Sequence, residues 1–213
     1  MSPAEAAPSL ADELADLGVS TIHEALGQTG LLDHEIRPLA AGMGLAGRAV
    51  TVELPPGDNL GIHQAIEACG HGDVLVVAAT GPPFGVFGEL LAVSLEARGA
   101  VGIVIDGGCR DVSELRSGRL GVFARTITAR GTTKDRPVAV NESIRCGDAV
   151  VNPGDVIVGD DDGVVVVPAR RIVEVIEAGR LRVELEEAGR VELERGVLTL
   201  DLLDLRSRIN NAD

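Results

Sequence analysis

The chain has 213 residues and a formal net charge of −14, from 19 basic and 33 acidic side chains. With 45% hydrophobic residues it can bury one sizeable core, so we expect a single domain over residues 1–213 and not a disordered chain. Aromatic residues are nearly absent (three Phe, no Trp, no Tyr) and no basic stripe is present, which argues against nucleic-acid binding.

The cysteines and the N-terminal residues bear on the compartment. Cys69, Cys109 and Cys146 lie far apart without a C-x-x-C pair, as is usual for reduced thiols in a cytosolic protein. The N-terminal residues lack the basic and apolar segments of a signal peptide, and no apolar run approaches the roughly 18 residues of a membrane span. We therefore expect a cytoplasmic protein with no membrane partner.

Hydrophobic periodicity and turn residues predict the elements of the first half of the chain. Ser20 is the expected N-cap of the second helix, and Asp58 or Asn59 that of the third. In order, we expect a flexible lead-in at residues 1–9, helices at 10–17 and 21–26, an irregular segment at 31–43, a half-buried strand at 47–53, a helix at 60–69 and a fully buried strand at 74–79.

The second half begins with a helix led by Gly88 and then carries mainly strand patterns. In order, we expect that helix to reach Arg98, then a strand at 101–105, a polar loop at 106–111, strand pieces at 121–125 and 127–129, alternating β-structure at 138–151, a hairpin at 153–168, and a C-terminal helix and tail (170–213) broken near Gly179, Gly189 and Gly196. Strict strand–helix alternation is missing, so the fold class is α/β with a mixed sheet.

Several glycine-rich and acidic motifs carry no chemistry that the spacing supports. Asp160, Asp161 and Asp162 follow one another, whereas an EF-hand needs alternate acids and a Glu at the twelfth position, so we interpret them as an acidic hairpin turn. The glycines at 81–88 lack a Walker lysine and a G-x-G-x-x-G pattern, and no G-x-S-x-G is present. A nucleotide site and a hydrolase elbow are therefore not expected.

Residues 88–114 contain two helix starts, one on each side of a buried strand. In Gly88-Glu89-Leu90-Leu91 the first N–H groups have no partner within the helix and attract a carboxylate or phosphate, although an ordinary helix start favoured by the helix dipole fits as well. Open α/β sheets place their ligands at the carboxyl ends of strands, which is where the second helix start lies.

Two interpretations of Asp111 remain open from spacing. In one it is the N-cap of a capping box that Glu114 completes at the third helical position. In the other it binds a hard metal ion, while Arg110 clamps a carboxylate or an oxyanion. Arg110 favours the second slightly, because an arginine directly after Gly-Gly-Cys has no obvious structural task.

The segments GELLA, IDGGCRDVSEL and PGDVIVGDDDGVVVVP, in this order, resemble the RraA-like family, and STIHEALG from Ser20 is similar to its S-T-x-x-x-A-L-G motif. The likeness extends from about Ser20 to about Pro168. The enzymes of this family are metal-dependent 4-hydroxy-4-methyl-2-oxoglutarate (HMG) aldolases that also decarboxylate oxaloacetate, and other members regulate ribonuclease E by protein binding.

The resemblance implies a swivelling β/β/α-type domain with flanking helices, assembled as trimers or hexamers with active sites between subunits. It also implies that the backbone of Gly88, Glu89, Leu90 and Leu91 holds the pyruvyl carboxylate of a 2-oxoacid substrate.

For the reacting atoms, the resemblance makes Arg110 the ligand of the substrate's keto or hydroxyl oxygen. Asp111 is then the ligand of Mg²⁺ or Mn²⁺, and Glu89 and Glu114 act through bound water. A C-terminal acid of a neighbouring subunit completes the outer shell of the metal; the candidates are Glu184, Glu186 and Glu187. Regulator-type members lack the acid after the arginine, so the pair Arg110-Asp111 favours an enzyme.

Overall fold

The computed structural model describes residues 9–79 and 81–210. The helices are α1 (Leu10–Leu17), α2 (Val19–Ala25), α3 (Leu60–Ala68), α4 (Glu89–Ala97), α5 (Val112–Ser117), α6 (Ile172–Glu194), α7 (Thr199–Leu202) and α8 (Arg206–Asn210), with a 3₁₀ turn at Ala169–Arg171. The strands are β1 (Arg37–Pro38), β2 (Leu45–Leu54), β3 (Asp73–Ala79), β4 (Gly85–Phe87), β5 (Gly102–Cys109), β6 (Gly121–Ile127), β7 (Ile144–Cys146), β8 (Ala149–Val151), β9 (Val156–Asp160) and β10 (Gly163–Val167). Within these residues no helix combines the length and the apolar character needed to cross a membrane.

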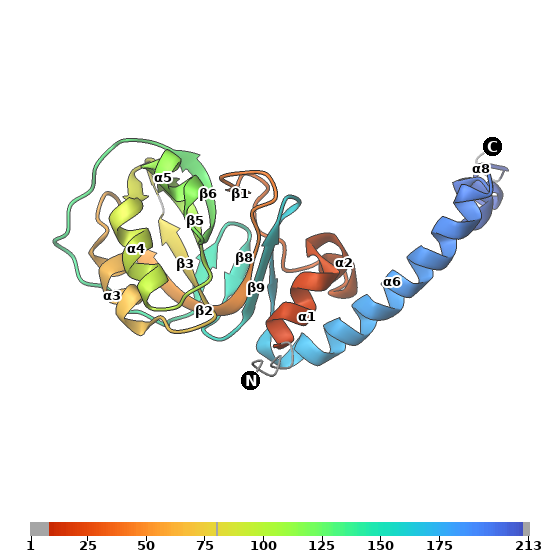
Figure 1. Ribbon diagram of the computed structural model, residues 1–213, viewed down its shortest axis with the longest axis horizontal. Coiled ribbons are helices and arrows are strands. Elements are labelled where there is room, and N and C mark those ends of the chain that lie inside the picture. The colour runs from red at the N-terminus through yellow and green to blue at the C-terminus, as the bar shows by residue number, and fades with distance from the viewer. Residues whose placement is uncertain (1–8, 80, 211–213) are drawn as a thin grey trace, which may run out of the picture.

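One mixed sheet organises the molecule, with the strand order β1-β6-β5-β3-β2-β9-β10 and β4 paired to β5 (Figure 1). The central strands β6, β5, β3 and β2 run parallel, whereas β9 and β10 form an antiparallel hairpin against β2. A second, two-stranded sheet consists of β7 and β8. The expected α/β class with a mixed sheet, flanking helices and a C-terminal helix is confirmed.

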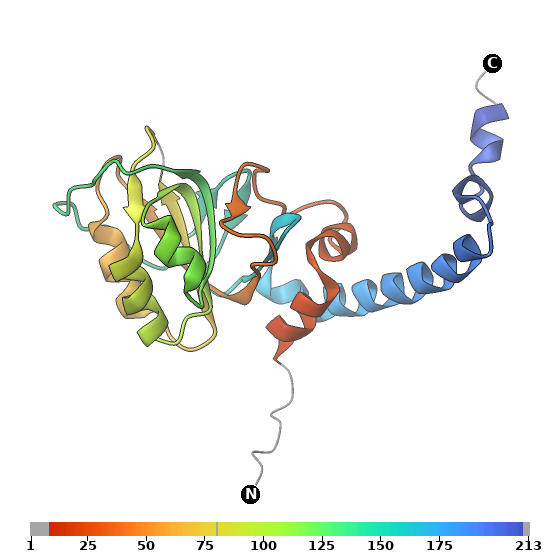
Figure 2. The same ribbon diagram turned by 45° about the horizontal axis from the view of Figure 1, so that its top comes forward.

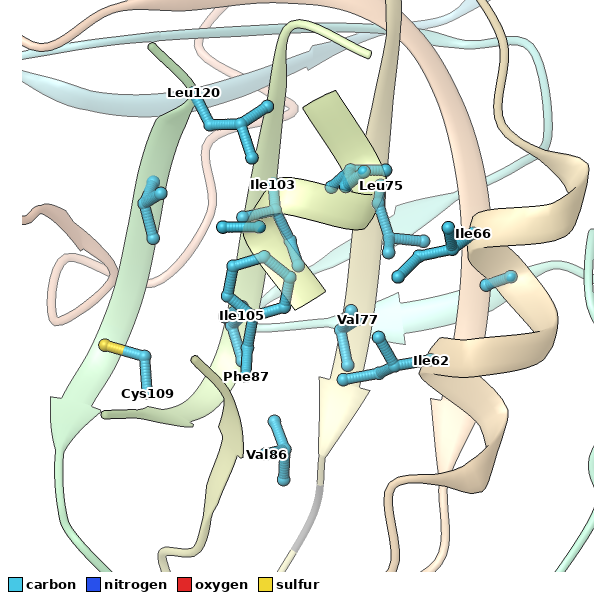
Figure 3. Packing of buried hydrophobic residues seen from close by; sticks show 14 of the residues in the cluster. Ile62, Ile66, Leu75, Val77, Val86, Phe87, Ile103, Ile105, Cys109 and Leu120 are labelled. Carbon is cyan, nitrogen blue, oxygen red and sulfur yellow. The ribbon is translucent and has the colours of Figure 1, made fainter. Parts of the chain in front are cut away.

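The central strands are apolar on both faces because both faces are covered. Helices α3, α4 and α5 cover one face, where Leu75, Ile103 and Phe87 pack together (Figure 3). On the other face Val76 packs with residues of the β7–β8 hairpin such as Val151. Each fully buried aliphatic side chain contributes about 1.5–3 kcal/mol to folding, so this double cover accounts for the nearly continuous apolar run predicted as a buried strand.

The N-terminal helices and α6 form a separate layer on the β9–β10 hairpin. Leu14, Ile22 and Val175 are buried there against Val165. Beyond this contact α6 projects away from the sheet and carries α7 and α8 at its far end (Figure 2). Residues 1–8, which belong to the expected lead-in, lie outside the described residues.

The C-terminal helix was predicted to break near Gly179 and Gly189, and this is wrong. Helix α6 continues through both glycines to Glu194 and ends before Gly196. Packing explains why a glycine stands at position 179 inside the helix, because a Cβ there would lie 2.5 Å from Leu17 Cδ1. A glycine inside a helix costs only about 1 kcal/mol, which close helix packing offsets.

The prediction that Ser20 caps a second helix starting at residue 21 is also wrong. Helix α2 begins at Val19, whose N–H donates to Asp160 Oδ2 at 2.8 Å, while the Ser20 hydroxyl donates to Asp162 Oδ2 at 2.7 Å. Asp161 accepts the N–H of Gly42. The acidic triplet is thus a hairpin turn that satisfies nearby backbone and hydroxyl donors, as expected.

At the third helix, the carboxylate of Asp58 accepts the N–H of Leu60 at 2.9 Å, so Asp58 and not the Asn59 side chain provides the cap.

The polar loop predicted at 106–111 is shorter than expected. Strand β5 continues through the two glycines to Cys109, with a bulge between Ile105 and Gly108. Asp106 is therefore a strand residue, and its carboxylate accepts the Arg125 Nε–H at 2.5 Å and the Gly147 N–H at 2.6 Å. A Cβ at Gly108 would lie 2.5 Å from the carbonyl oxygen of Phe84, so the close approach of β4 explains this glycine.

Candidate functional site

The two helix starts noted in the sequence lie side by side in the fold. Strand β4 leads into α4 at Gly88, and β5 leads into α5 at Asp111. Because β4 and β5 are paired and parallel, both strands end at the same edge of the sheet. The backbone N–H of Arg110 donates to the carbonyl of Phe87 at 2.9 Å, which fixes the two ends relative to each other. The side chain of Phe87 points into the core beside Ile105 and anchors the junction (Figure 3).

Asp111 joins the two helix starts through its side chain. Its Oδ2 accepts the backbone N–H of Glu89 at 3.2 Å, at the first residue of α4. It stands at the N-cap position of α5 with left-handed φ and ψ angles of 54° and 44°, and makes no side-chain cap there. The capping-box interpretation with Glu114 is therefore wrong, because the left-handed backbone turns the carboxylate towards α4.

Gly88 is required by this arrangement. A Cβ at Gly88 would lie 2.3 Å from Asp111 Oδ2 and 3.1 Å from Arg110 Cγ. Its φ of −154° is ordinary extended backbone, so the constraint is space and not conformation. The absent side chain leaves the start of α4 open to the carboxylate of Asp111 and to the stem of Arg110.

Arg110 extends over the glycines that surround it. A Cβ at Gly85 would meet its Cβ and Cδ at 3.2 and 3.3 Å, and a Cβ at Gly131 would lie 4.0 Å from its Nη1. Its Nε is 3.8 Å from Asp111 Oδ2, and the side chains of both residues are nearly half exposed (46% and 44%). Arg110 and Asp111 thus form a loose ion pair, and no other side chain of the described residues pairs with the guanidinium, which leaves N–H groups for a ligand.

Glu89 and Glu114 face a groove between α4 and α5. This groove has a volume of about 230 Å³, and its apolar floor includes Leu115 and Leu120. Both carboxylates are in exposed residues, next to the Asp111–Glu89 hydrogen bond. The predicted residues of the two helix starts therefore come together in one place.

Leu90 and Leu91 differ in their surroundings. Leu90 is 82% exposed on the first turn of α4, whereas Leu91 packs partly against the core. The backbone N–H of Glu89 donates to Asp111, while those of Leu90 and Leu91 have no partner within the helix. These two N–H groups are the ones available to a carboxylate.

The candidate C-terminal acids are not brought to this site by their own chain. Glu184, Glu186 and Glu187 lie on α6, on the opposite side of the molecule from α4 and α5 (Figure 1). Glu186 pairs with Arg182 at 2.8 Å and Glu187 with Arg190 at 3.3 Å.

The thiol of Cys109, directly before Arg110, is buried in the core. Burial raises the pKa of this thiol to about 11, so it is protonated at neutral pH. A protonated, enclosed thiol is a poor nucleophile, and Cys109 has a packing role.

The donor set of the site fits a divalent ion held mainly by water. Asp111 uses Oδ2 for Glu89 and Arg110, and in the part of the chain that the structure describes its Oδ1 has no hydrogen-bond partner. Over the same residues no cluster of three or more His, Cys, Asp or Glu side chains has the arrangement of a protein-built metal cage. One carboxylate with several waters is a coordination that Mg²⁺ accepts.

Sequence reasoning missed Phe84 and Arg130, which border the site. The Arg130 guanidinium carbon lies 3.9 Å from the centre of the Phe84 ring, and the Arg130 carbonyl accepts the N–H of Gly85 at 2.8 Å. The sequence did offer one signal: the chain has only three phenylalanines, and one of them, Phe84, lies in a glycine- and proline-rich loop.

Comparisons with known proteins show the family of the chain. The family model for RraA-like proteins, described as Aldolase/RraA, matches residues 11–166. A protein of Halalkalibacterium halodurans named "Putative 4-hydroxy-4-methyl-2-oxoglutarate aldolase" is 32% identical over 168 residues, which cover 78% of this chain and 80% of the relative.

Solved structures share the fold. A protein of Pseudomonas syringae pv. tomato superposes with a TM-score of 0.81 at 26% identity, over 97% of this chain and 98% of its own. Streptomyces coelicolor RraAS2, described as an unusual member of the RNase ES inhibitor RraA protein family, superposes with a TM-score of 0.78 at 27% identity, over 86% and 97%.

Proposed function

Because the chain belongs to the RraA-like family, we propose that it is a divalent-metal-dependent aldolase that cleaves HMG-type 2-oxoacids to pyruvate and also decarboxylates oxaloacetate. The observation that carries this proposal is the Asp111 carboxylate and the Arg110 guanidinium at the open start of α4. A retro-aldol reaction needs a site for a carboxylate, a cationic group for developing negative charge, and a route for one proton.

The carboxylate next to the keto group binds at the start of α4. The N–H groups of Leu90 and Leu91 have no partner in the helix, and the helix dipole favours an anion at this end. The missing side chain at Gly88 leaves room for the Asp111 carboxylate and the Arg110 stem, which keeps both groups next to this carboxylate site. This contact orients the 2-oxoacid so that its keto oxygen faces Arg110.

Arg110 acts on the oxygen at which charge develops. The bond between C3 and C4 of the substrate breaks, and its electron pair becomes the enolate of pyruvate. The guanidinium donates hydrogen bonds to the oxygen that takes this charge. A Mg²⁺ or Mn²⁺ ion held by Asp111 supplies Lewis-acid stabilisation of the same charge when it is bound.

The C4 hydroxyl must lose its proton while C3 gains one. An ordered water held by Glu89 or Glu114 takes the hydroxyl proton, because both carboxylates face the groove beside Asp111. A proton returned to C3 then gives pyruvate. Loss of CO₂ from oxaloacetate leaves the same enolate, so one site serves both reactions.

We further propose that a second copy of the chain completes the site in a trimer or hexamer. Leu90 and Val93 lie on α4 beside the site and are 82% and 58% exposed, so they offer a second copy an apolar contact next to the site. In such an assembly Glu184, Glu186 or Glu187 of a neighbour is the candidate for the outer shell of the metal.

The test is pyruvate release from HMG and from oxaloacetate, measured with and without Mg²⁺. We expect activity that requires the metal and that EDTA abolishes. Arg110→Ala and Asp111→Ala are each expected to lower kcat by about 10²- to 10³-fold, because the first removes the donor to the reacting oxygen and the second removes the carboxylate that would hold the metal. Full activity in both variants would show that the site lies elsewhere.

A second candidate function is regulation of a ribonuclease by protein binding. The net charge of −14 and the likeness to RraAS2 favour it. The pair Arg110–Asp111 favours the enzyme, because a surface that only binds a protein has no need of an arginine held open beside a helix start. A stable ribonuclease complex in a pull-down, together with no turnover of any 2-oxoacid, would reverse this order.

A further inference from the structure

The long connection after β6 passes over the candidate site. The N–H of Thr128 donates to the carbonyl of Cys109 at 2.9 Å, and the N–H of Gly85 donates to the carbonyl of Arg130 at 2.8 Å. The backbone of Arg130 is therefore tied to the ends of β5 and β4, the two strands that present Arg110 and Gly88. Arg130 has a fixed position relative to the site although its residue is exposed.

The side chain of Arg130 lies on an aromatic ring instead of pairing with an acid. Its guanidinium carbon is 3.9 Å from the centre of the Phe84 ring. Among residues 9–79 and 81–210, no carboxylate oxygen lies within 4.0 Å of it, in a chain with 33 acidic residues. Arg125 on the adjoining strand differs, since it contacts Asp33, Glu35 and Asp106. Stacking fixes the plane of the guanidinium and leaves its N–H edge free.

Arg130 also neighbours Arg110. A Cβ on Gly131, the next residue, would lie 4.0 Å from Arg110 Nη1. The segment that carries Arg130 therefore runs beside the Arg110 guanidinium, and two arginines at the same end of the sheet favour an anion there. Since Asp111 is 3.8 Å from Arg110, it offsets part of the charge of Arg110 only.

The far end of the connection is anchored in the protein interior. Asp58 is fully buried, and its Oδ2 accepts the Thr133 hydroxyl and the Asp135 N–H, both at 2.7 Å. The N–H of Thr133 donates to the carbonyl of Gly57 at 2.9 Å, and Gly57 lies under the Phe84 ring, which its Cβ would meet at 3.0 Å. The same anchor thus holds both Arg130 and the ring on which it rests.

We propose that Arg130, seated on Phe84, is the specificity residue for the second carboxylate of a dicarboxylic 2-oxoacid. This inference rests on the proposed function, in which the start of α4 holds the first carboxylate and Arg110 the reacting oxygen. The free edge of the Arg130 guanidinium donates two parallel hydrogen bonds to the distal carboxylate. Arg130 takes no part in the bond-breaking step.

The experiment compares substrates with and without the distal carboxylate. HMG has the distal carboxylate, whereas 4-hydroxy-4-methyl-2-oxopentanoate has a methyl group in its place. A third reaction, the exchange of the C3 protons of pyruvate with solvent deuterium, involves no distal carboxylate. For Arg130→Gln we expect kcat/KM on HMG to fall about 10- to 100-fold, the value of a charge-assisted pair. For the same variant we expect the rates of two other reactions to stay within about twofold of the wild type. These are cleavage of the pentanoate and exchange of the pyruvate protons, both monitored by NMR.

Conservative variants separate recognition from folding. Arg130→Lys keeps the charge without the planar fork, so we expect an intermediate kcat/KM on HMG. Phe84→Leu removes the ring and is expected to raise KM with little change in kcat. For oxaloacetate the distal carboxylate leaves as uncharged CO₂, so Arg130→Gln is expected to raise KM without lowering kcat. Arg119→Gln, an exposed arginine on the α5–β6 connection, is the matched control and should leave all rates unchanged.

The outcomes distinguish the two proposals. A wild-type protein that neither cleaves HMG nor exchanges pyruvate protons refutes the proposed function, and this inference falls with it. An active wild type whose Arg130→Gln variant keeps its preference for HMG over the pentanoate refutes the inference alone. An equal loss on HMG, pentanoate and pyruvate exchange also refutes it, because Arg130 would then support the whole site.

Discussion

The Oδ2 of Asp111 accepts the backbone N–H of Glu89 at 3.2 Å, although the two residues are 22 positions apart. This hydrogen bond ties the start of α5 to the start of α4 and brings Arg110 alongside. It makes one site from two helix starts that are separate in the sequence, so variants that disturb it test the arrangement directly.

Gly88→Ala is expected to lower activity much more than stability. Its Cβ would lie 2.3 Å from Asp111 Oδ2, so the half-exposed carboxylate must rotate away while the extended backbone accepts alanine without strain. Misplacing a reacting group by about 1 Å can cost about 10²-fold in rate, so we expect a loss of that size in kcat/KM with a small change in Tm. Gly70→Ala is the control, since its Cβ makes only an ordinary 3.6 Å contact with Asp73. Unchanged kinetics in Gly88→Ala would contradict the role of the Asp111–Glu89 contact.

Asp58 is expected to contribute stability that acid removes. Burial alone would raise the pKa of this carboxyl, but hydrogen bonds from the Asp135 N–H, the Thr133 hydroxyl and the Leu60 N–H lower the pKa to about 2. Because the folded-state pKa lies below that of the unfolded chain, about 3.9, the contribution is complete above that value. It is lost as the pH falls towards 2.

Urea unfolding between pH 2 and pH 7 measures this contribution. Asp58→Asn is expected to be less stable than the wild type at pH 7, and the difference is expected to shrink as the pH falls below 4. A difference between the two proteins that stayed constant over this range would show that the charge of Asp58 is not what stabilises the connection.

Arg125 is expected to be important for folding and not for substrate binding. Its guanidinium contacts Asp33 at 3.0 Å, Glu35 at 2.6 Å and Asp106 at 2.5 Å, and these contacts raise its pKa against the opposing effect of burial. Arg125→Met leaves three carboxylates facing one another in a partly buried place, so we expect a loss of about 3 kcal/mol in the free energy of unfolding at neutral pH. Urea unfolding checks this value, and Asp106→Asn in the same background should restore part of it.

Leu90→Glu is expected to weaken the proposed assembly of subunits. The side chain is 82% exposed in one chain, so a charge there costs little unless a second copy covers it. We expect a smaller particle by light scattering after gel filtration, with an unchanged circular dichroism spectrum. Val150→Glu, at a position that is 51% exposed on β8, is the control. An unchanged mass for Leu90→Glu would mean that this face of α4 is not an interface.

Local chemistry was enough to predict much of the fold. The helix predicted at 10–17 is observed with the same ends, and both ends are set locally, by the capping box of Ser9 with Asp12 and by Gly18. The apolar run at 74–79 and the hairpin around the acidic triplet were also predicted, since burial on two faces and a turn rich in Asp and Gly leave clear patterns. The grouping of Gly88, Arg110 and Asp111 came from the resemblance to a family.

What remained depended on partners that are distant in the sequence. Spacing could not decide whether the Asp111 carboxylate caps its own helix or reaches α4, because that choice follows from a left-handed backbone and a missing Cβ at Gly88. The start of α2 depends on Asp160, 141 positions away, and the length of β5 depends on its pairing with β4 and β6. Periodicity reports only neighbours within about one helical turn, so the contact of Arg130 with Phe84 had no local signature. The sequence alone therefore determined most of the elements and the chemistry they carry, and the tertiary structure decided several of their ends and which of those groups face the same space.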